Sequence, residues 1–432
     1  MKFPGRRKLK HYFPVSQSKP VLPTSEVRPD KDTYIVGLDE TIVDVVANVS
    51  DDFLNKFNIK KGLSNLVDAN TAASIFLELT AQECISDHFA GGTIGNTIHN
   101  YSVLADDKSV LLGVMSANIP LGSPAYHYIC HTSSKVDMNH LQGVPGDIGR
   151  GITLITPDGE RTFAIAPGDM DELNVEHIPE NIIAGAAALV TCAYPLRHQG
   201  KPIKSAMLKA LEYAHQHQVP TVLTLGTSHL VEEHRDELLA LIKQYVDVLA
   251  MNELEAEALT GFSDPLEAAS AILDHVDIVL LTVGPDGMYL CGHTEAALKR
   301  ETTNPIKSAS LADFNRWEFS RPMSRKACQH PVKVYSHIDP YLGGPDKIRN
   351  TNGAGDGALS ALLHDISANH FHKDALPNSS KHIAAYLAYS SFAQICKYAN
   401  RVSYEILVQN ASRLSKGLPE REDSLEEAYW GQ

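Results

Sequence analysis

The sequence predicts an α/β fold with a central, mostly parallel sheet, helices on both of its faces and a small separate β unit. The main observation is the rhythm of the chain beyond residue 186, where short β-branched runs alternate with amphipathic segments. Strands that alternate with helices form parallel sheets covered by helices. The second observation is a hairpin pattern within the first 170 residues, which does not fit that rhythm.

The first 170 residues supply the separate β unit. Residues 152–155 and 161–166 flank the turn Pro157-Asp158-Gly159, and this pattern predicts a hairpin. Periodicity predicts helices at 69–85 and 94–105, one or two strands within 33–49, and a strand at 110–114. We therefore assign residues 39–50 and 110–170 to the β unit.

The α/β part follows in regular alternation. The expected strands are 186–192, 221–225, 246–251, 278–283 and 287–291, and the expected helices are 203–217, 232–244 and 252–259. Residues 292–350 break this rhythm and form an insert, because a connection of this length is uncommon in a compact domain. A helix follows from Gly353 to about 367, and residues 380–399 are expected to form a second long helix.

These assignments divide the 432 residues into three parts. A polar, Pro-rich arm occupies residues 1–32, one α/β domain occupies 33–405, and a charged tail occupies 406–432. The arm has no apolar stretch after its basic residues, so it is not a secretory signal.

Composition and charge exclude several classes of protein. With 43% hydrophobic and 21% charged residues, the chain is neither fibrous nor disordered. The net charge of −14 argues against nucleic acid and anionic membranes as partners. No run is long and apolar enough to cross a bilayer. Six well-separated cysteines without a CxxC pair indicate reduced thiols in a cytoplasmic protein.

The segment Gly353-Ala354-Gly355-Asp356 carries the strongest chemical signal. It opens a helix, whose first N–H groups and partial positive charge bind anions. An aspartate at that place can act as a general base beside an anion hole, which is the arrangement that phosphoryl transfer needs. The structural alternative is an ordinary helix cap. A dinucleotide site is rejected because no good strand precedes the glycines, and no P-loop motif is present.

Four motifs in order resemble the ribokinase (PfkB) family of sugar and nucleoside kinases over residues 33–405. They are Ala90-Gly91-Gly92-Thr93-Ile94-Gly95-Asn96, Asn252-x-x-Glu255, Thr282-x-Gly284-x-x-Gly287 and Asn350-Thr351-Asn352-Gly353-Ala354-Gly355-Asp356. The resemblance implies a ribokinase-like fold in which the β unit is a lid. It also implies transfer of a phosphoryl group from ATP to a hydroxyl of a sugar or nucleoside.

The resemblance implies catalytic roles for five residues. Asp356 is the expected general base that deprotonates the acceptor hydroxyl. The N–H groups of Ala354 and Gly355 form the expected anion hole, and Gly353 provides the turn. Arg161 on the lid hairpin is expected to reach the phosphates, with a solvent-exposed hairpin arginine as the alternative.

The resemblance also implies an acceptor site. Asp44 lies where nucleoside kinases place the carboxylate that binds the ribose diol, although a strand-end Asp facing water is the alternative. Gly91-Gly92 is the expected lid hinge, with an ordinary tight turn as the alternative. Asn96 is expected to bind sugar hydroxyls.

The remaining motifs concern ATP and the metal. The residues expected to line the ATP site are Thr224, Thr282, Gly284 and Gly287. Asn252 and Glu255 lie one helical turn apart and share a face, and they are expected to organise Mg²⁺ largely through water. The alternative for Asn252 is a helix N-cap. Where the family usually has Asp, this chain has Asn350, which brings no charge and argues against K⁺ activation.

The expected reaction is ATP-dependent phosphorylation of the 5′-hydroxyl of a purine nucleoside, inosine or guanosine. The purine preference rests on the resemblance alone. An adenosine or sugar kinase is the first alternative, and a non-catalytic nucleoside-binding protein is the second. The insert precedes the catalytic loop and is expected to cover the nucleotide site. The sequence leaves the oligomeric state open between a monomer and a homodimer.

Overall fold

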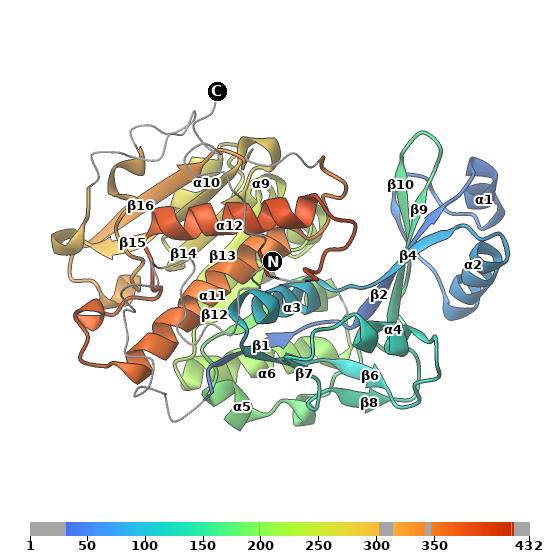
Figure 1. Cartoon of the computed structure of the whole chain (residues 1–432), viewed down its shortest axis with the longest axis horizontal. Helices are drawn as coiled ribbons and strands as arrows, with labels where there is room; N and C mark the ends of the chain where they lie inside the picture. Colours follow the sequence, from blue (N-terminus) through green and yellow to red (C-terminus); the bar gives the residue numbers. More distant parts are fainter. Residues whose placement is uncertain (1–31, 198, 302–313, 342–346, 416, 419–432) are drawn as a thin grey trace.

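The computed structural model describes residues 32–197, 199–301, 314–341, 347–415 and 417–418, and it contains a nine-stranded central sheet (Figure 1). The strand order is β16-β15-β14-β13-β12-β11-β1-β5-β7. The strands are β1 (Tyr34–Leu38), β5 (Lys108–Leu112), β7 (Val136–Asp137), β11 (Leu189–Cys192), β12 (Thr221–Thr224), β13 (Val248–Asn252), β14 (Ile278–Thr282), β15 (Met288–Glu295) and β16 (Pro331–Ile338). All neighbours from β7 to β14 are parallel, and β15 and β16 continue the sheet antiparallel. The predicted mostly parallel α/β sheet is confirmed.

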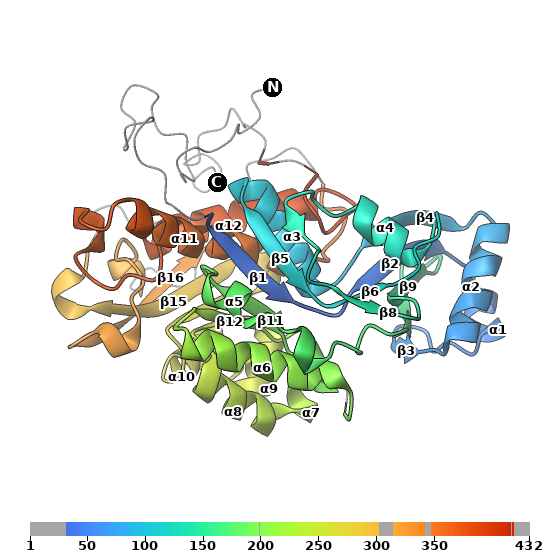
Figure 2. The same cartoon turned by 90° about the horizontal axis from the view of Figure 1, so that it is seen from below.

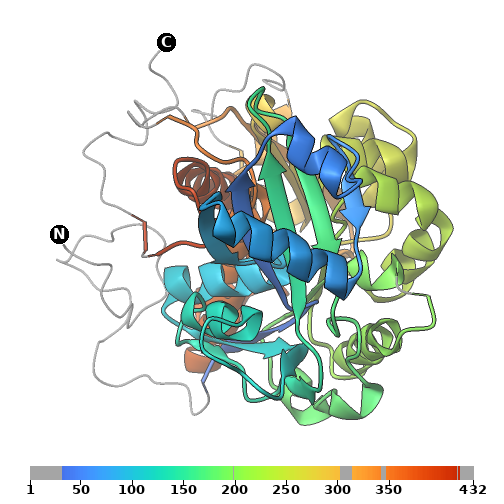
Figure 3. The same cartoon turned by 90° about the vertical axis from the view of Figure 1, so that its right-hand side faces the viewer.

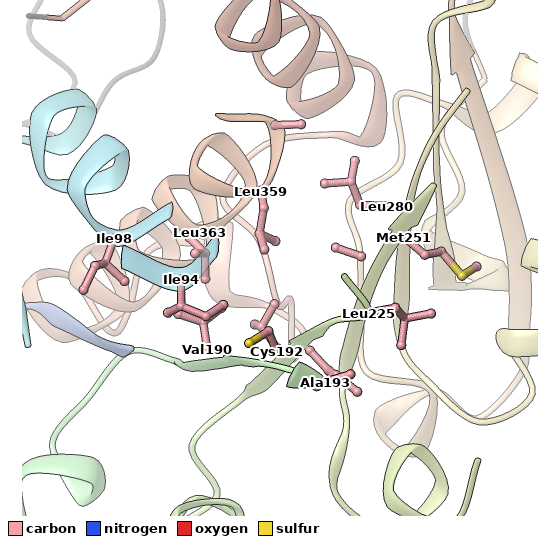
Figure 4. Packing of buried hydrophobic residues seen from close by; sticks show 14 of the residues in the cluster. Ile94, Ile98, Val190, Cys192, Ala193, Leu225, Met251, Leu280, Leu359 and Leu363 are labelled. Atoms are coloured by element: carbon pink, nitrogen blue, oxygen red, sulfur yellow. The ribbon is translucent and has the colours of Figure 1, made fainter. Parts of the chain in front are cut away.

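Helices cover both faces of this sheet (Figure 2). One layer contains α3 (Thr93–Ala105), α11 (Ala354–Ala375) and α12 (Phe392–Leu407). The other contains α5 (Glu180–Ala184), α6 (Pro202–Gln216), α7 (Ser228–Glu233), α8 (Arg235–Tyr245), α9 (Glu253–Thr260) and α10 (Pro265–Ile272). Figure 4 shows Ile94 and Ile98 of α3 beside Leu359 and Leu363 of α11, over Val190 of β11. These five side chains are at most 1% exposed, so apolar burial fixes α3 and α11 to each other and to the sheet.

A second, five-stranded sheet lies to one side of this body, and we call it the small sheet (Figures 1 and 3). Its strands, in spatial order, are β3 (Ser64–Leu66), β10 (Arg161–Ala166), β9 (Gly149–Ile155), β2 (Ile42–Asn48) and β4 (Ile85–Ala90). The helices α1 (Asp51–Lys56) and α2 (Ala69–Ala81) lie in the chain between its strands. The predicted hairpin is present as the antiparallel pair β9–β10.

The expected range of the β unit differs from the small sheet in two places. The helix expected over 69–85 ends earlier, at Ala81, and residues 85–90 form β4 and pair with β2. The strand expected at 110–114 lies instead in the central sheet, as β5 paired with β1. Between the two sheets, β6 (Val114–Ser116) and β8 (Gln142–Val144) form a separate pair, and α4 (Pro124–Cys130) lies between them in the chain. The apolar run at residues 108–116 thus contributes one strand to each of two sheets, β5 and β6. The amino-acid composition of the run does not predict this division.

The prediction of a long helix over residues 380–399 is wrong. The structure has a short 3₁₀ turn at Ser380–His382, and α12 begins only at Phe392. The Ser391 hydroxyl accepts from Gln394 N–H at 3.3 Å, and the Gln394 side chain accepts from Ser391 N–H at 3.2 Å. This reciprocal capping fixes the helix start. At the other end, α12 runs to Leu407, past the expected domain boundary at 405.

Much of the insert belongs to the central sheet. Strand β16 pairs with β15 along eight residues, from Met288↔Ile338 to Glu295↔Pro331. The segment of the insert before β16 packs against the start of α12. Phe392 N–H donates to the carbonyl oxygen of Ser320 at 3.0 Å, and Ala393 N–H donates to that of Glu318 at 2.8 Å. Residues 302–313 and 342–346, the expected arm to residue 31 and the tail from residue 419 lie outside the described residues.

Within the described ranges, none of the helices has the length and apolar character that a membrane crossing requires. All six cysteines lie in these ranges, and none of them is in a disulfide.

We predict that Leu363→Ala lowers the free energy of unfolding by about 2–5 kcal/mol, because the truncated side chain leaves a cavity between α11 and the sheet. The control is Leu77→Ala on α2, whose side chain is 69% exposed and whose loss should change stability by at most about 0.5 kcal/mol. Urea unfolding of the two variants measures both values. Equal losses would contradict the assigned core.

Candidate active site

The polar residues singled out in the sequence gather at the carboxyl ends of the parallel strands. In open α/β sheets ligands bind at this edge. Asn252 ends β13 and is the register partner of Thr282 at the end of β14. Thr224 ends β12 and lies beside Cys192 of β11 and Ala250 of β13. The chain after β1 reaches the same edge.

The N-terminus of α3 is fixed by an aspartate that the sequence analysis did not select. Asp39 follows β1, and its Oδ2 accepts from Ile94 N–H at 2.8 Å and Gly95 N–H at 3.0 Å. Gly92 begins the helix with φ +84°, and a Cβ there would lie 2.7 Å from the same oxygen. Burial raises the pKa of Asp39 to about 7, against these hydrogen bonds. Asp39 therefore holds the first turn of α3 in place.

Asp44 lies on β2 between two glycines. It is the register partner of Gly151, and a Cβ on Gly151 would lie 2.8 Å from Asp44 Oδ1. A Cβ on Gly91 would lie 2.4 Å from Asp44 Oδ2. Burial raises the pKa of Asp44 to about 6, and the charge of Arg413 opposes this rise. The structure thus brings Asp44 and the diglycine together.

The start of α11 supplies a helix N-terminus with room in front of it. Gly353 is the N-cap with φ +81°, where a Cβ would lie 2.5 Å from Ser412 Cβ. The first helical bond runs from Gly357 N–H to Gly353 O at 2.9 Å, so the N–H groups of residues 354–356 precede the ladder. A Cβ on Gly355 would meet no atom within 4 Å. An anion can therefore approach these amides.

Asp356 lies in the first turn of α11 and faces α3. Its Oδ2 accepts from Asn96 Nδ2 at 3.1 Å. Burial raises the pKa of Asp356 to about 7, and the charges of Asp39 and Asp44 add to the rise. The Asn96 hydrogen bond and the charge of Arg413 oppose it. A carboxylate with this pKa can accept a proton near neutral pH.

Arg413 is the functional residue that sequence reasoning missed most completely. It is 6% exposed, and its guanidinium donates to Asn96 Oδ1 at 2.9 Å, Gly91 O at 2.8 Å and Thr132 Oγ1 at 2.7 Å. It lies in the irregular segment after α12, with no motif or periodicity around it. Only the three-dimensional structure reveals it, since its partners are up to 322 positions away.

Asn252 and Glu255 form the N-terminal capping box of α9. Asn252 Oδ1 accepts from Glu255 N–H at 2.9 Å, and the Glu255 carboxylate accepts from the N–H and the Nδ2 of Asn252 at 3.0 and 2.9 Å. Glu255 is 4% exposed, and burial raises its pKa to about 7. The charge of Glu253 adds to this rise, and a buried carboxylate beside a second carboxylate suits a hydrated cation. No group of three metal-ligating side chains occurs among the described residues.

The Gly284–Gly287 turn joins β14 to β15. Both glycines have positive φ, +51° and +89°, and a Cβ on Gly287 would lie 2.0 Å from Ile338 O. The end of the insert therefore contacts this turn. Thr224 lies two strands away from this turn, because β13 separates β12 from β14 in the sheet.

The small sheet reaches the loop before α11 through Arg161. This residue begins β10, and its Nη1 lies 3.5 Å from Asn350 Oδ1. Asn350 Oδ1 also accepts from Asn352 N–H at 3.0 Å. Arg161 is half-buried, so it does not simply extend into solvent from the hairpin.

Comparison with known proteins agrees with this geometry. The family model described as pfkB family carbohydrate kinase matches residues 131–309. The chain is 56% identical to proteins named guanosine-inosine kinase from three strains of Escherichia coli, including K12, and each match covers 100% of both sequences. The chain belongs to the pfkB family of carbohydrate kinases. Membership makes the protein a phosphotransferase, and it implies ATP as the co-substrate.

Solved structures of pfkB-like kinases share the fold. A probable sugar kinase from Rhizobium etli has a TM-score of 0.64 at 21% identity, covering 90% of this chain and 96% of that one. An adenosine kinase from Sinorhizobium meliloti has a TM-score of 0.64 at 20% identity, covering 90% and 98%. The adenosine kinase from Schistosoma mansoni with 2-fluoroadenosine has a TM-score of 0.62 at 16% identity, covering 89% and 98%.

We predict that Asp356→Asn raises the free energy of unfolding at pH 8 and leaves it nearly unchanged at pH 4. The unfolded Asp loses its proton near its ordinary pKa of 3.8, whereas the folded one keeps it to about 7. The folded state thus binds more protons between these values, so wild-type stability falls as pH rises through this window. The Asp356→Asn variant has no carboxyl group at this position, so it does not lose this stability as pH rises.

Urea unfolding at pH 4, 6 and 8 measures the effect. Asp158→Asn serves as a control of opposite sign, because hydrogen bonding to Lys61 lowers the pKa of Asp158. A variant that matches wild type at pH 8 would contradict the raised pKa of Asp356.

Proposed function

We propose that this protein phosphorylates the 5′-hydroxyl of inosine and guanosine with ATP, giving IMP and GMP. The substrate assignment is carried by one observation, the 56% identity over the whole length to proteins named guanosine-inosine kinase. The three adenosine and sugar kinase structures described above are 21% identical or less, so they support the fold alone. An adenosine or sugar kinase is the alternative, and a non-catalytic nucleoside-binding protein is a weaker one.

Asp356 acts as the general base in this proposal. It takes the proton from the 5′-hydroxyl as the oxygen attacks the terminal phosphorus of ATP. Its pKa of about 7 suits this step, because an efficient base has a pKa near the working pH. The Asn96 amide holds the carboxylate at 3.1 Å and orients it. The presence of this base argues against a silent binding protein.

The N-terminus of α11 stabilises the charge on the transferred group. The N–H groups of Ala354 and Gly355 precede the helical ladder and point where negative charge develops. The absence of a side chain at Gly355 leaves space for the phosphates. The turn at Gly353 requires glycine both for its positive φ and for its contact with Ser412.

The small sheet serves as a lid over the acceptor. Asp44 binds the ribose diol, and Gly91-Gly92 is the hinge between the small sheet and α3. Asn96 binds the sugar hydroxyls and also donates a hydrogen bond to Asp356, the proposed general base. Arg161 comes from the lid to the phosphates. Closure excludes water, which would otherwise accept the phosphoryl group.

The nucleotide lies along the ends of β12, β13 and β14. Thr224, Thr282, Gly284 and Gly287 line its site. Asn252 and Glu255 hold Mg²⁺ through water, which agrees with a metal that keeps much of its hydration shell. When bound, Mg²⁺ neutralises charge on the phosphates. The end of the insert covers the Gly284–Gly287 turn, as the contact of Gly287 with Ile338 supports.

A monovalent cation near Asn350 is disfavoured. The oxygen of this amide already accepts from Asn352 N–H, and the Arg161 guanidinium lies 3.5 Å away. A second cation there would meet a like charge. Activity without added K⁺ is therefore part of the proposal.

We predict that Asp356→Asn lowers kcat about 10²–10⁴-fold and leaves nucleoside binding near normal, because a general base contributes this much. ADP release is measured with Mg-ATP against inosine, guanosine, adenosine, ribose and fructose. Binding is measured by calorimetry. For wild type, kcat/KM should fall about tenfold per pH unit below pH 7, where Asp356 becomes protonated.

Each outcome of this assay separates the alternatives. Turnover on inosine and guanosine that is lost in the variant supports the proposal. Turnover only on adenosine or a free sugar would overturn the specificity. Nucleoside binding without turnover on any acceptor would favour the silent binding protein.

We predict that Asp44→Asn raises KM for inosine about 10- to 100-fold, because a charged hydrogen bond to the diol contributes about 1.5–3 kcal/mol. The KM for ATP should not change. Asp52→Asn is the matched control, since Asp52 is an exposed acid on α1 beside the same sheet. An unaltered KM for inosine would contradict the role of Asp44.

A further inference from the structure

The segment that follows α12 crosses the first turns of α3 and α11, and we call residues 408–414 the C-terminal strap. Leu414 N–H donates to Asn100 Oδ1 at 2.7 Å, and Asn100 Nδ2 donates to Ser412 O at 3.1 Å. His99 Nε2 lies 2.9 Å from Leu414 O. Gln409 Nε2 donates to Arg413 O at 3.1 Å. These bonds fix the backbone of the strap on both sides of Arg413.

We infer that Arg413 is a positioning residue for phosphoryl transfer, because one guanidinium orients Asn96 toward Asp356 and holds the carbonyl of the Gly91 hinge. The inference rests on the proposed function. Arg413 reaches the base through Asn96 rather than by touching the reacting atoms.

The orientation of the Asn96 amide carries the argument. A guanidinium has only donors, so the amide oxygen must face Arg413 Nε, 2.9 Å away. The Nδ2 group then faces Asp356 Oδ2 at 3.1 Å and donates to it. With the opposite orientation, an amide oxygen would face the carboxylate and repel it. The hydrogen bond from Arg413 therefore determines whether the Asn96 amide can donate a hydrogen bond to Asp356.

The same guanidinium also holds the hinge. Its Nη2 donates to Gly91 O at 2.8 Å, and Gly91 packs against the Asp44 carboxylate. Its Nη1 donates to Thr132 Oγ1 at 2.7 Å, beyond α4. Three different segments thus converge on one side chain, and two of them carry proposed substrate contacts.

The site for the guanidinium is built into α3. A Cβ on Gly95 would lie 2.8 Å from Arg413 Nη2 and 2.6 Å from the Tyr128 hydroxyl. The Arg413 guanidinium carbon lies 4.9 Å from the centre of the Tyr128 ring. Only glycine at position 95 leaves room for both side chains. This requirement lies inside the first family motif, directly before Asn96.

The charge of Arg413 matters as well as its shape. The ionisable groups that act on Asp356 are Asp39 after β1, Asp44 of β2, Arg413 of the strap and Tyr194 after β11. Arg413 is the only cation among them. Its charge lowers the pKa of both Asp44 and Asp356 against burial. The acid limb of the kcat/KM profile is the pH range in which activity falls as Asp356 becomes protonated. Removal of Arg413 should therefore shift this limb to higher pH.

The test compares wild type with Arg413→Lys and Arg413→Met. We expect Arg413→Met to lower kcat about 10- to 100-fold with little change in the KM for ATP, since misplacement of a reacting group has this cost. The acid limb of kcat/KM should move to higher pH. Arg413→Lys keeps the charge, but all its donors lie on one nitrogen and cannot span the three acceptors that Nε, Nη1 and Nη2 reach, so kcat should fall while the acid limb stays near its wild-type position.

The matched control is Arg321→Met. Arg321 also donates to three groups, Ala388 O, Lys381 O and Asn369 Oδ1, and it lies over the Tyr386 ring at 3.9 Å. Its loss should lower stability without moving kcat or the acid limb. Should Arg413→Met not fold, Gly95→Ala provides an independent variant. It keeps Arg413 but displaces the guanidinium, and it should lower kcat.

Two outcomes would overturn the inference. One is a folded Arg413→Met with wild-type kcat and an unmoved acid limb. The other, where that variant does not fold, is wild-type kcat in both Arg413→Lys and Gly95→Ala. Failure of the proposed function is distinct, because it requires that wild type itself has no turnover on inosine or guanosine.

Discussion

Three aspartates and one arginine, brought together where the two sheets meet, are the constraint on which the site depends. Asp39, Asp44 and Asp356 each have a pKa raised by burial to between about 6 and 7. The charges of Asp39 and Asp44 add to the rise at Asp356, and Arg413 is the cation that opposes the raised pKa at Asp44 and Asp356. The proton affinity that suits Asp356 to its proposed role as general base thus arises from the same crowding of buried groups that makes the folded state less stable at neutral pH.

This crowding explains why glycines surround the site. A side chain at Gly91 or Gly151 would displace Asp44, and one at Gly92 would displace Asp39. A side chain at Gly95 would displace Arg413. The glycines of the first family motif therefore do more than permit a hinge. They leave the volume that buried carboxylates and a guanidinium need against the backbone.

The sequence predicts secondary structure and motifs within short windows, and it does not predict contacts between residues that are far apart in the chain. The parallel sheet, the β9–β10 hairpin and the α11 N-terminus at Asp356 follow from periodicity and turn residues within short windows. The second strand of the insert, β16, and the late start of α12 were missed, although Ser391 and Gln394 carry a capping signature. Asp39 could have been found as a polar residue at a strand end. Arg413 could not, because its role depends on contacts with residues 91, 96 and 132.

These long-range contacts couple catalysis to completion of the fold. Asn96 and Arg413 are 317 positions apart, and the strap directly follows α12, which packs on α11 and the central sheet. Contacts between such distant residues form only after the entropy of closing the intervening chain has been overcome. Before the strap is seated, Asn96 lacks the partner that orients its amide, and Asp44 and Asp356 lack their cation. A chain with both sheets formed but the strap unseated would therefore contain every residue of the family motifs and still hold its base incorrectly.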